Sequence, residues 1–442
     1  MKLYFYQVGS RANTKPHFGI MSLCLGLMLC FLMPRPAGAD RVMTLSDALQ
    51  STLASDPGIQ AARERQREAE TLEDLALANW RPSISARAGL FTSVIDGSNF
   101  SGRADGTTTK EVGLGINQPL YRGGQSLSEL NSARALITAE KWRAYAFQQD
   151  RLLETGLAYA AALRDRHIYN FKKEILSNIQ KDAEMIADQV RLGMRPASDL
   201  NSVRAERARQ IALSQQSLLS LKRQETRLRA LSGIVMDVAL QNPDLSSLLS
   251  SVAGMHDSTA IHQNPEILAA RAREEAAKSD AEAARRRQYP QLSAYADYNH
   301  QTDPQPGIID RTGVATFGVN ASIDLYQGGA QRARITRAER AARRNRLESM
   351  DQEQFITGVL NENKSVYTTA LAEMAARQEE VNVRRREIDS TLERIQLGAI
   401  TPALLFDQRQ DLLTAKIGFA QAEFQKNSRY FTNFARNRFQ SG

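Results

Sequence analysis

The sequence predicts an α+β membrane protein with long coiled-coil helices, four transmembrane β-strands per chain and two tandem structural repeats. Three observations support this fold class. A set of motifs occurs twice, residues 125–192 and 330–397 contain no proline, and four segments alternate apolar and polar residues over the length of a membrane strand. Together they give each repeat the order helix, strand, loop, strand, very long helix, turn and helix.

The duplication is visible as motifs that recur at a nearly constant offset. The recurring pairs are Pro57 and Pro265, Pro82 and Pro290, Leu120 and Leu325, and Gly193 and Gly398. The offset is 208 residues for the first two pairs and 205 residues for the last two. A repeat of this length indicates a duplicated structural unit. We therefore expect repeat 1 at 40–233, a linker at 234–257 and repeat 2 at 258–442.

Residues 1–39 are predicted to be a cleaved signal peptide. Basic residues from Lys2 onward precede the apolar stretch 18–33, and the small residues 37–39 precede Asp40. This pattern is typical of secretory leaders, and the stretch is short for the alternative, an uncleaved transmembrane anchor. Both cysteines of the chain lie in this leader, so the mature chain would hold no disulfide and no thiolate metal site.

The charge balance gives little support to nucleic-acid binding. The chain has 57 Lys and Arg against 49 Asp and Glu, a net charge of +8, and four of the basic residues lie in the leader. A mature charge of +4 on a secreted chain is weak evidence for a nucleic-acid partner. The arginine-rich stretch 332–346 is interpreted as a solvated helix face. The sequence shows no phosphate loop, catalytic triad spacing or metal cluster, so we predict neither an enzyme nor a cofactor.

Each repeat contains a predicted β-hairpin, at 83–120 and at 291–325. In the first strand Ile84, Ala86, Ala88 and Leu90 alternate with polar or small residues, and the other strands follow the same period of two. Each strand is about ten residues long, which is the length of a tilted membrane strand. A half-buried hairpin on a soluble core would show the same alternation and is the alternative for one hairpin alone.

The proline-free stretches are predicted to be single helices of about 100 Å at 1.5 Å per residue. Apolar residues recur every seven positions in the second stretch, which predicts a left-handed coiled coil. These residues are Leu360, Tyr367, Met374, Val381, Ile388 and Ile395. Gly193 and Gly398 are expected to end the helices as capping glycines, and Pro196 and Pro402 to begin the returning helices at 197–231 and 402–436.

Four strands cannot close a β-barrel, because about eight is the practical minimum. An open strand edge in lipid leaves unpaired backbone groups, each costing several kcal/mol. Several chains must therefore share one barrel. Two chains would give a barrel filled by side chains, and three would leave a lumen. The small, polar set that would face inward favours three: Gly113, Gly115, Asn117, Gly318 and Asn320.

The motifs at the strand–helix junctions and at the ends of the long helices resemble those of the TolC family of outer-membrane channel proteins. The matching segments are Asn117 to Gly124, its copy Leu325 to Gly329, and the two tips Arg191 to Leu200 and Gln396 to Pro402. The resemblance covers about residues 45–439. It implies a homotrimer with a shared 12-strand barrel in the outer membrane and a helical tunnel across the periplasm, around which the linker would join a girdle.

The resemblance also implies a function. Such proteins are passive exit channels of tripartite export systems, in which a periplasmic adaptor and an inner-membrane pump of the ABC or RND type dock and supply energy. Their cargo is secreted proteins in type I secretion, or drugs and small toxic compounds in efflux. A periplasmic adaptor or a coiled-coil scaffold without a pore is the alternative, because such proteins also carry long helical hairpins.

The family's constriction at the periplasmic end supplies the candidate site residues. By position, Asp407 matches one aspartate of its inward ring, and Leu404 stands where the second ring aspartate would be. Asp199 matches an acid that helps to lock the closed state. Its usual arginine partner would fall at Ile400, so Arg195 is the nearby substitute.

Two further sets of residues are carried over with the family. Adaptor docking is expected at the tips, around Gly193, Pro196, Gly398 and Pro402. Four aromatic residues at the strand–helix junctions suit a membrane-interface girdle, with packing between barrel and tunnel as the alternative. These residues are Trp80, Tyr121, Tyr289 and Tyr326.

Overall fold

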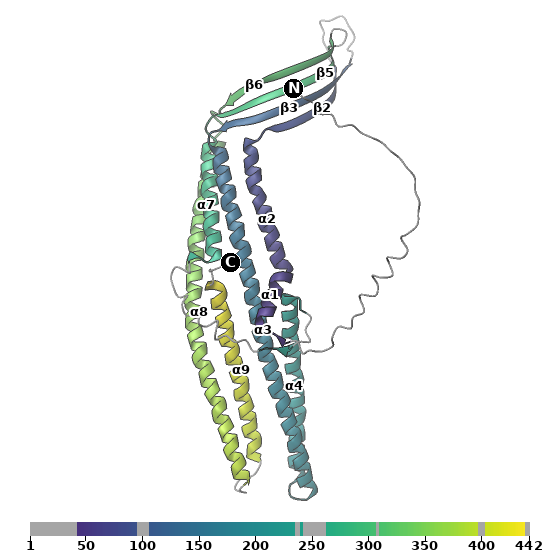
Figure 1. The fold of residues 1–442 in the computed structure, drawn as a ribbon, viewed down its shortest axis with the longest axis vertical. Helices are drawn as coiled ribbons and strands as arrows, with labels where there is room; N and C mark the ends of the chain where they lie inside the picture. The colour runs from purple at the N-terminus through teal and green to yellow at the C-terminus, as the bar shows by residue number, and fades with distance from the viewer. Residues whose placement is uncertain are drawn as a thin grey trace, which may run out of the picture.

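The computed structural model describes residues 42–94, 106–234, 239–241, 262–305, 309–396 and 403–437. Long helices run along one axis, and a β-sheet lies at one end of them (Figure 1). In chain order the elements are β1 (Val42–Met43), α1 (Leu45–Ser55), α2 (Pro57–Leu77), η1 (Ala78–Trp80), β2 (Ser83–Val94), β3 (Gly106–Arg122), α3 (Gln125–Arg191), α4 (Ala197–Ser232), β4 (Ala239–Leu240), α7 (Pro265–Arg286), β5 (Gln291–Gln305), β6 (Ile309–Ser322), α8 (Ala330–Gln396) and α9 (Ala403–Asn437). The predicted leader, most of the linker, Gly398, Ile400 and Pro402 lie outside the described residues.

Both predicted helix starts next to proline are present. Asp56 caps α2, its side chain accepting a hydrogen bond from the Ile59 amide, and Pro57 is the first helical residue. Asn264 and Pro265 begin α7 in the same way. Proline is tolerated at this position because the first amides of a helix have no partner within the helix.

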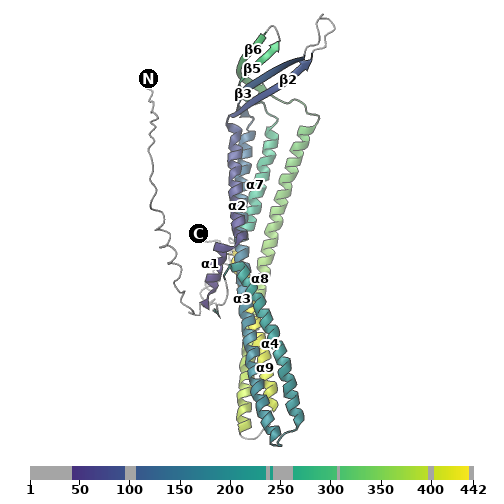
Figure 2. The same ribbon diagram turned by 90° about the vertical axis from the view of Figure 1, so that its right-hand side faces the viewer.

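The long helices α3 and α8 contain 67 residues each and run without interruption, which corresponds to about 100 Å. In the half next to the sheet, α3 packs between α2 and α7, and α7 packs against α8. Helices α2 and α8 therefore form the two edges of this layer (Figure 2). In the other half α4 and α9 pack against α3, and α9 also packs against α8. None of the described helices carries an apolar segment long enough to cross a membrane.

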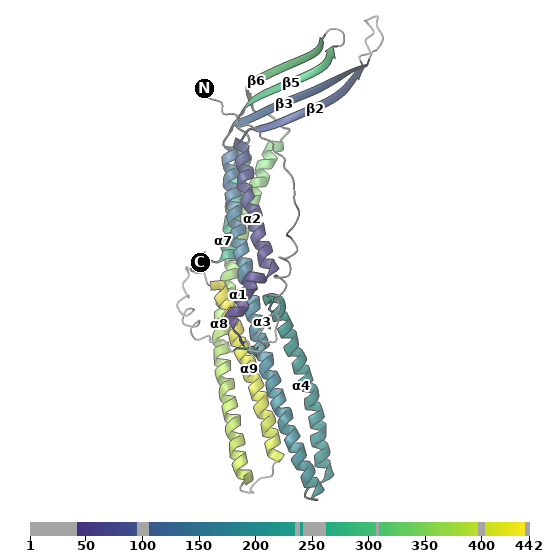
Figure 3. The ribbon, with the colours of Figure 1, turned by 45° about the vertical axis from the view of Figure 1, so that its right-hand side comes forward.

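The four long strands form one antiparallel sheet in the order β2-β3-β5-β6 (Figure 3). They contain 12, 17, 15 and 14 residues, so they are longer than the predicted ten. Strand β3 continues past Pro119 because a register shift between Pro119 and Tyr121 restores its pairing with β5. Such a bulge bends a strand without ending it.

The register places most of the apolar residues of the four strands on one face. One row across the sheet is Ile84, Ile116, Ala296 and Phe317, and the next is Ala86, Leu114, Tyr298 and Ala315. Ile84 is 73% exposed and Phe317 is 85% exposed in the single chain. A slip by one residue would move this set to the other face, so the sequence specifies the register strongly. An apolar face of this extent requires lipid or another protein to cover it.

The opposite face of the sheet is mainly polar and contains the predicted small residues of β3. Arg87 on β2 reaches across β3 to Asp297 on β5, with 3.2 Å between Nη2 and Oδ1. A Cβ atom on Gly115 would lie 2.6 Å from Oδ1 of Asp297. The glycine on the intervening strand therefore leaves the space through which this ion pair forms.

Where the two halves of the helical layer meet, a buried cluster joins α1, α3, α4 and α9. Its members include Tyr159, Leu228 and Tyr430, each at most 2% exposed. The short strands β1 and β4 pair in parallel beside it. Helix α1 was not predicted from the sequence. It begins with a capping box in which Thr44 and Asp47 each accept a hydrogen bond from the other's backbone amide.

Candidate functional site

The tip of the first helical hairpin lies at the end of the molecule farthest from the sheet. Helix α3 ends there, and Gly193 adopts a left-handed conformation with φ of 71°. The Gly193 amide donates to the Val190 carbonyl, and the Met194 amide donates to the Gln189 carbonyl. These two bonds form a Schellman motif, which satisfies the last carbonyls of the helix. The predicted capping role of Gly193 is therefore confirmed.

The chain after this cap exposes apolar side chains and then begins α4. Leu192 is 69% exposed and Met194 is 74% exposed. Pro196 is the N-cap residue of α4, with extended backbone, so the helix begins one residue later at Ala197. Pro196 thus ends the turn, and the exposed pair Leu192 and Met194 forms its outermost apolar surface.

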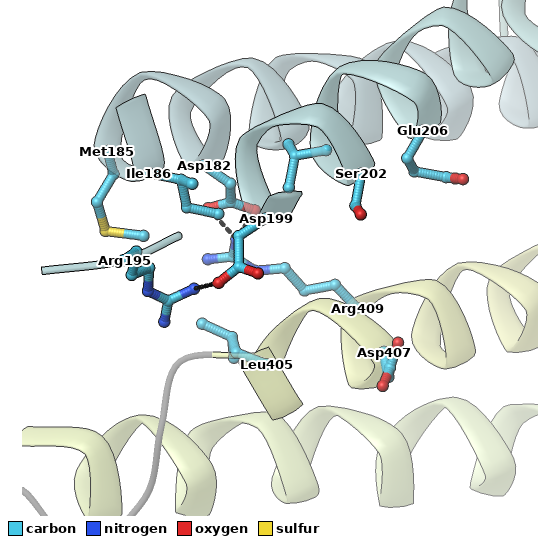
Figure 4. A pocket seen from close by; sticks show the side chains of 11 residues that line it. Asp182, Met185, Ile186, Arg195, Asp199, Ser202, Glu206, Leu405, Asp407 and Arg409 are labelled. Carbon is cyan, nitrogen blue, oxygen red and sulfur yellow. Dashed lines mark hydrogen bonds and ion pairs between the residues drawn. The ribbon is translucent and has the colours of Figure 1, made fainter. Parts of the chain in front are cut away.

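An open cavity of about 370 Å³ lies close to this tip, between α3, α4 and α9 (Figure 4). The structure brings all three predicted constriction residues, Arg195, Asp199 and Asp407, to its lining. The remaining charged residues of the lining are Asp182, Glu206 and Arg409. Four carboxylates and two guanidinium groups leave the lining with two excess negative charges, an arrangement that attracts cations.

Arg195 and Asp199 form an ion pair, with 3.7 Å between Nη1 and Oδ2. The substitute partner proposed for Asp199 is thus within reach in the single chain. The two residues are four positions apart at the same tip, and the Asp199 side chain is 40% exposed. An exposed pair of this kind contributes at most about 1 kcal/mol to stability, and it does not connect the two hairpins.

A second ion pair at the cavity does connect them. Nη1 of Arg409 on α9 lies 3.0 Å from both carboxylate oxygens of Asp182 on α3. Both side chains are less exposed than Asp199. Figure 4 shows Arg409 extending towards Asp182 from the opposite side of the cavity. This pair holds the second helical hairpin against the first.

Glu206 is held in its charged form by neighbouring donors. Arg209 donates two hydrogen bonds of 2.8 Å to the Glu206 carboxylate, and Gln210 donates a third. The Arg209 hydrogen bonds are the main reason why the pKa of Glu206 lies below its ordinary value. These donors therefore favour the negatively charged carboxylate at the cavity.

Sequence reasoning missed Asp182, Glu206 and Arg409. They lie on helices that meet only in the folded chain, and Asp182 and Arg409 are 227 positions apart. Their positions relative to the two tips could have indicated the pair. Asp182 precedes Gly193 by eleven residues and Arg409 follows Gly398 by eleven, so both lie equally far from their tip. Leu404 does not line the cavity, whereas its neighbour Leu405 does.

The four predicted aromatic residues lie where the sheet meets the helices. Trp80 ends η1, Tyr121 lies in β3, Tyr289 follows α7 and Tyr326 follows β6. All four are exposed, from 39% for Trp80 to 86% for Tyr326. They are therefore free in the single chain to contact lipid headgroups or a neighbouring chain.

The fold is thus a four-stranded sheet with an apolar and a polar face, continued by helices of about 100 Å. A sequence profile described as "Outer membrane efflux protein" matches residues 48–234 and 258–442. The chain belongs to this outer-membrane efflux protein family, that is, to the TolC family of efflux channels.

Individual relatives are distant in sequence but similar over most of their length. Outer membrane efflux protein BepC of Brucella suis biovar 1 (strain 1330) is 21% identical over 381 residues, covering 86% of this chain and 82% of that protein. A membrane protein of Pseudomonas aeruginosa of known structure gives a TM-score of 0.77 at 18% identity, covering 89% of this chain and 93% of that one. The Campylobacter jejuni CmeC outer membrane channel gives 0.75 at 14% identity, covering 89% and 85%. These two structures share the fold of this chain.

Proposed function

We propose that three copies of this chain form a passive exit channel in the outer membrane, as part of a tripartite export system. The polarity of the four-stranded sheet is the observation that carries the proposal. Its apolar face is exposed, its other face is polar, and the outer edges of β2 and β6 have no strand partner among the described residues. Three such sheets joined edge to edge would make a closed barrel of twelve strands with a polar lumen.

The long helices extend this lumen into the periplasm and end at the tips. The exposed Leu192 and Met194 beside the cap at Gly193 support docking of a periplasmic adaptor there. The corresponding tip around Gly398 and Pro402 is proposed to do the same. An inner-membrane pump would then drive transport, and the cargo is secreted proteins or small toxic compounds according to that pump. Family membership and the sheet favour this channel over an adaptor or a scaffold.

The cavity at the periplasmic end is proposed as part of the constriction. Asp407 is exposed on α9 and forms no ion pair with another described residue, so three copies around an axis would present a ring of free carboxylates. Arg195 and Asp199 would stabilise the first tip, and Arg409 with Asp182 would hold the second hairpin in the closed position. Trp80, Tyr121, Tyr289 and Tyr326 are proposed to mark the periplasmic interface of the outer membrane.

Single-channel conductance in planar lipid bilayers tests this proposal. The purified protein should form pores that Mg²⁺ blocks from the periplasmic side. Asp407→Ala should raise the half-blocking Mg²⁺ concentration at least about tenfold, because the free carboxylates that bind the ion are removed. Asp188→Ala, which removes an acid at the same end but outside the cavity lining, should leave the block unchanged. Unaltered block in Asp407→Ala would refute the ring, and absence of pores would refute the channel.

A further inference from the structure

The face of α8 that points away from α7 carries arginines without acidic partners among the described residues. They are Arg332, Arg337, Arg340 and Arg343, all exposed. Arg344, by contrast, pairs with Glu348 on its own helix at 3.4 Å. A solvated helix face usually alternates the signs of its charges, so a row of one sign indicates a partner that supplies the other.

This face is hollowed between the arginines. An open groove of about 550 Å³ is lined by Gly329, Arg332, Ala333, Thr336, Arg337 and Arg340. Half of the lining residues are small and the other half are arginines. A second helix can pack closely against α8 here, because small side chains leave room for it.

The helix at the opposite edge of the layer, α2, has a complementary stripe. Glu64, Glu68, Thr71 and Leu75 are spaced by four, three and four residues, so they share one side of the helix, and all four are exposed. Leu75 is 66% exposed, and Glu68 has no ion-pair partner among the described residues. Glu64 pairs only with Arg67 on its own helix.

The two surfaces also match in height along the molecule. Helix α2 runs towards the sheet and ends at Leu77, whereas α8 runs away from it and begins at Ala330, at a similar level in Figures 1 and 2. Glu68 lies 9 residues from that end of α2, and Arg340 lies 10 residues from the start of α8. Counted from these two helix ends, the positions differ by one residue, or about 1.5 Å along a helix axis.

The other positions of the stripe match in the same way. Glu64 and Arg343 each lie 13 residues from the sheet end of their helix. Thr71 and Thr336 each lie 6 residues from it. Thr336 of the groove therefore falls level with Thr71, and Arg340 and Arg343 fall level with Glu68 and Glu64, respectively.

We propose that the α8 groove of one chain receives α2 of a second copy, with Glu68 opposite Arg340 and Glu64 opposite Arg343. This contact specifies how neighbouring chains touch in the proposed trimer, and it rests on that proposed function. Strand β2 lies on the same side of the chain as α2, and β6 lies on the side of α8, so the unpaired strand edges would meet through the same contact. It joins two different surfaces, and a repeated contact of this kind forms a ring when its rotation closes, as it does in the proposed trimer.

Cysteine cross-linking tests the contact. Both cysteines of the chain lie outside the described residues, so Thr71→Cys and Thr336→Cys introduce the reporting thiols. With a short bifunctional thiol reagent, the double variant should give a covalent ladder that ends at three chains. Each single variant should give none, because the contact never brings two copies of the same residue together.

The outcomes separate this contact from the trimer itself. A trimeric native mass without cross-links in the double variant would overturn the contact and leave the trimer standing. A ladder that ends at two chains would support the contact and refute the trimer. A monomer without cross-links would refute both.

Charge reversal gives an independent measurement. Glu68→Arg and Arg340→Glu should each lower the fraction of assembled protein that survives heating in detergent at least about threefold, and their combination should restore it. Glu70→Arg makes the same charge change on the other flank of α2 and serves as the control. Equal losses in all three single variants, with no recovery in the combination, would overturn the proposed pairing.

Discussion

Tyr159 shows how one side chain holds distant segments of this chain together. It is completely buried in α3, and its hydroxyl lies 2.8 Å from the Met43 carbonyl and 2.6 Å from the Gln241 carbonyl. Met43 belongs to β1 and Gln241 follows β4, so the hydroxyl lies beside the parallel pair that these strands form. Burial raises the pKa of the Tyr159 phenol to about 12, because the charged form is poorly solvated there.

This shift predicts a pH dependence of stability. The phenol ionises near pH 10 in the unfolded chain, so the folded state is favoured at lower pH and loses that advantage as pH rises from about 10 to 12. Tyr159→Phe should lower the free energy of unfolding at neutral pH by about 1 kcal/mol through the lost hydrogen bond. It should also flatten the decline above pH 10.

Thermal unfolding in detergent between pH 7 and 12 measures both effects. Tyr326→Phe, at a position that is 86% exposed, is the control and should follow the wild type. An identical pH profile for Tyr159→Phe and the wild type would contradict the assigned role of this phenol.

At the scale of the elements, the hairpin tip depends on a backbone conformation. Gly193 has φ of 71°, and a Cβ atom there would meet no other atom within 4 Å. Any cost of substitution at Gly193 is therefore conformational. Gly358 also has open space around it, but it lies inside the long helix α8. The two glycines thus isolate the effect of backbone conformation.

The same substitution should consequently have opposite effects at these two positions. Gly193→Ala should lower stability by about 1 kcal/mol, because L-residues disfavour the left-handed region. Gly358→Ala should raise it by about 0.5–1 kcal/mol, since alanine favours helix over glycine. Thermal midpoints of the two variants and the wild type provide the comparison. A shift of the same sign in both would contradict the cap assignment.

Local signals predicted some elements well and missed others for physical reasons. The starts of α2 and α7 and the end of α3 follow from proline, capping side chains and glycine, which act within a few residues. Helix α1 was missed although Thr44 and Asp47 form a capping box, because its 11 residues precede the first repeated motif. The extra length of β3 depends on pairing with β5, which no local pattern of β3 reveals.

The candidate site shows the same division between local and distant information. Arg195 and Asp199 are neighbours at one tip, so their pairing could be expected from spacing alone. Asp182 and Arg409 meet only because α3 packs against α9. Asp407 lines their cavity, but its proposed partners in a ring belong to other copies of the chain. Contacts between chains cannot be deduced from the periodicity of one of them.

On the scale of the whole molecule, a single chain has several surfaces that lack a contact partner. The sheet has an exposed apolar face and two outer edges, and the helical layer has an arginine groove on one edge and a glutamate stripe on the other. Each of these features is explained when three chains close around a common axis in the outer membrane. The family to which the chain belongs supports the same membrane location.

The native mass of the mature chain, extracted in detergent from the outer-membrane fraction, tests this account most directly. A trimer is expected, because both outer edges of the four-stranded sheet need partners and twelve strands leave a lumen for the polar face, whereas eight would be filled by side chains. A monomer, or recovery of the chain in the soluble periplasm, would contradict it.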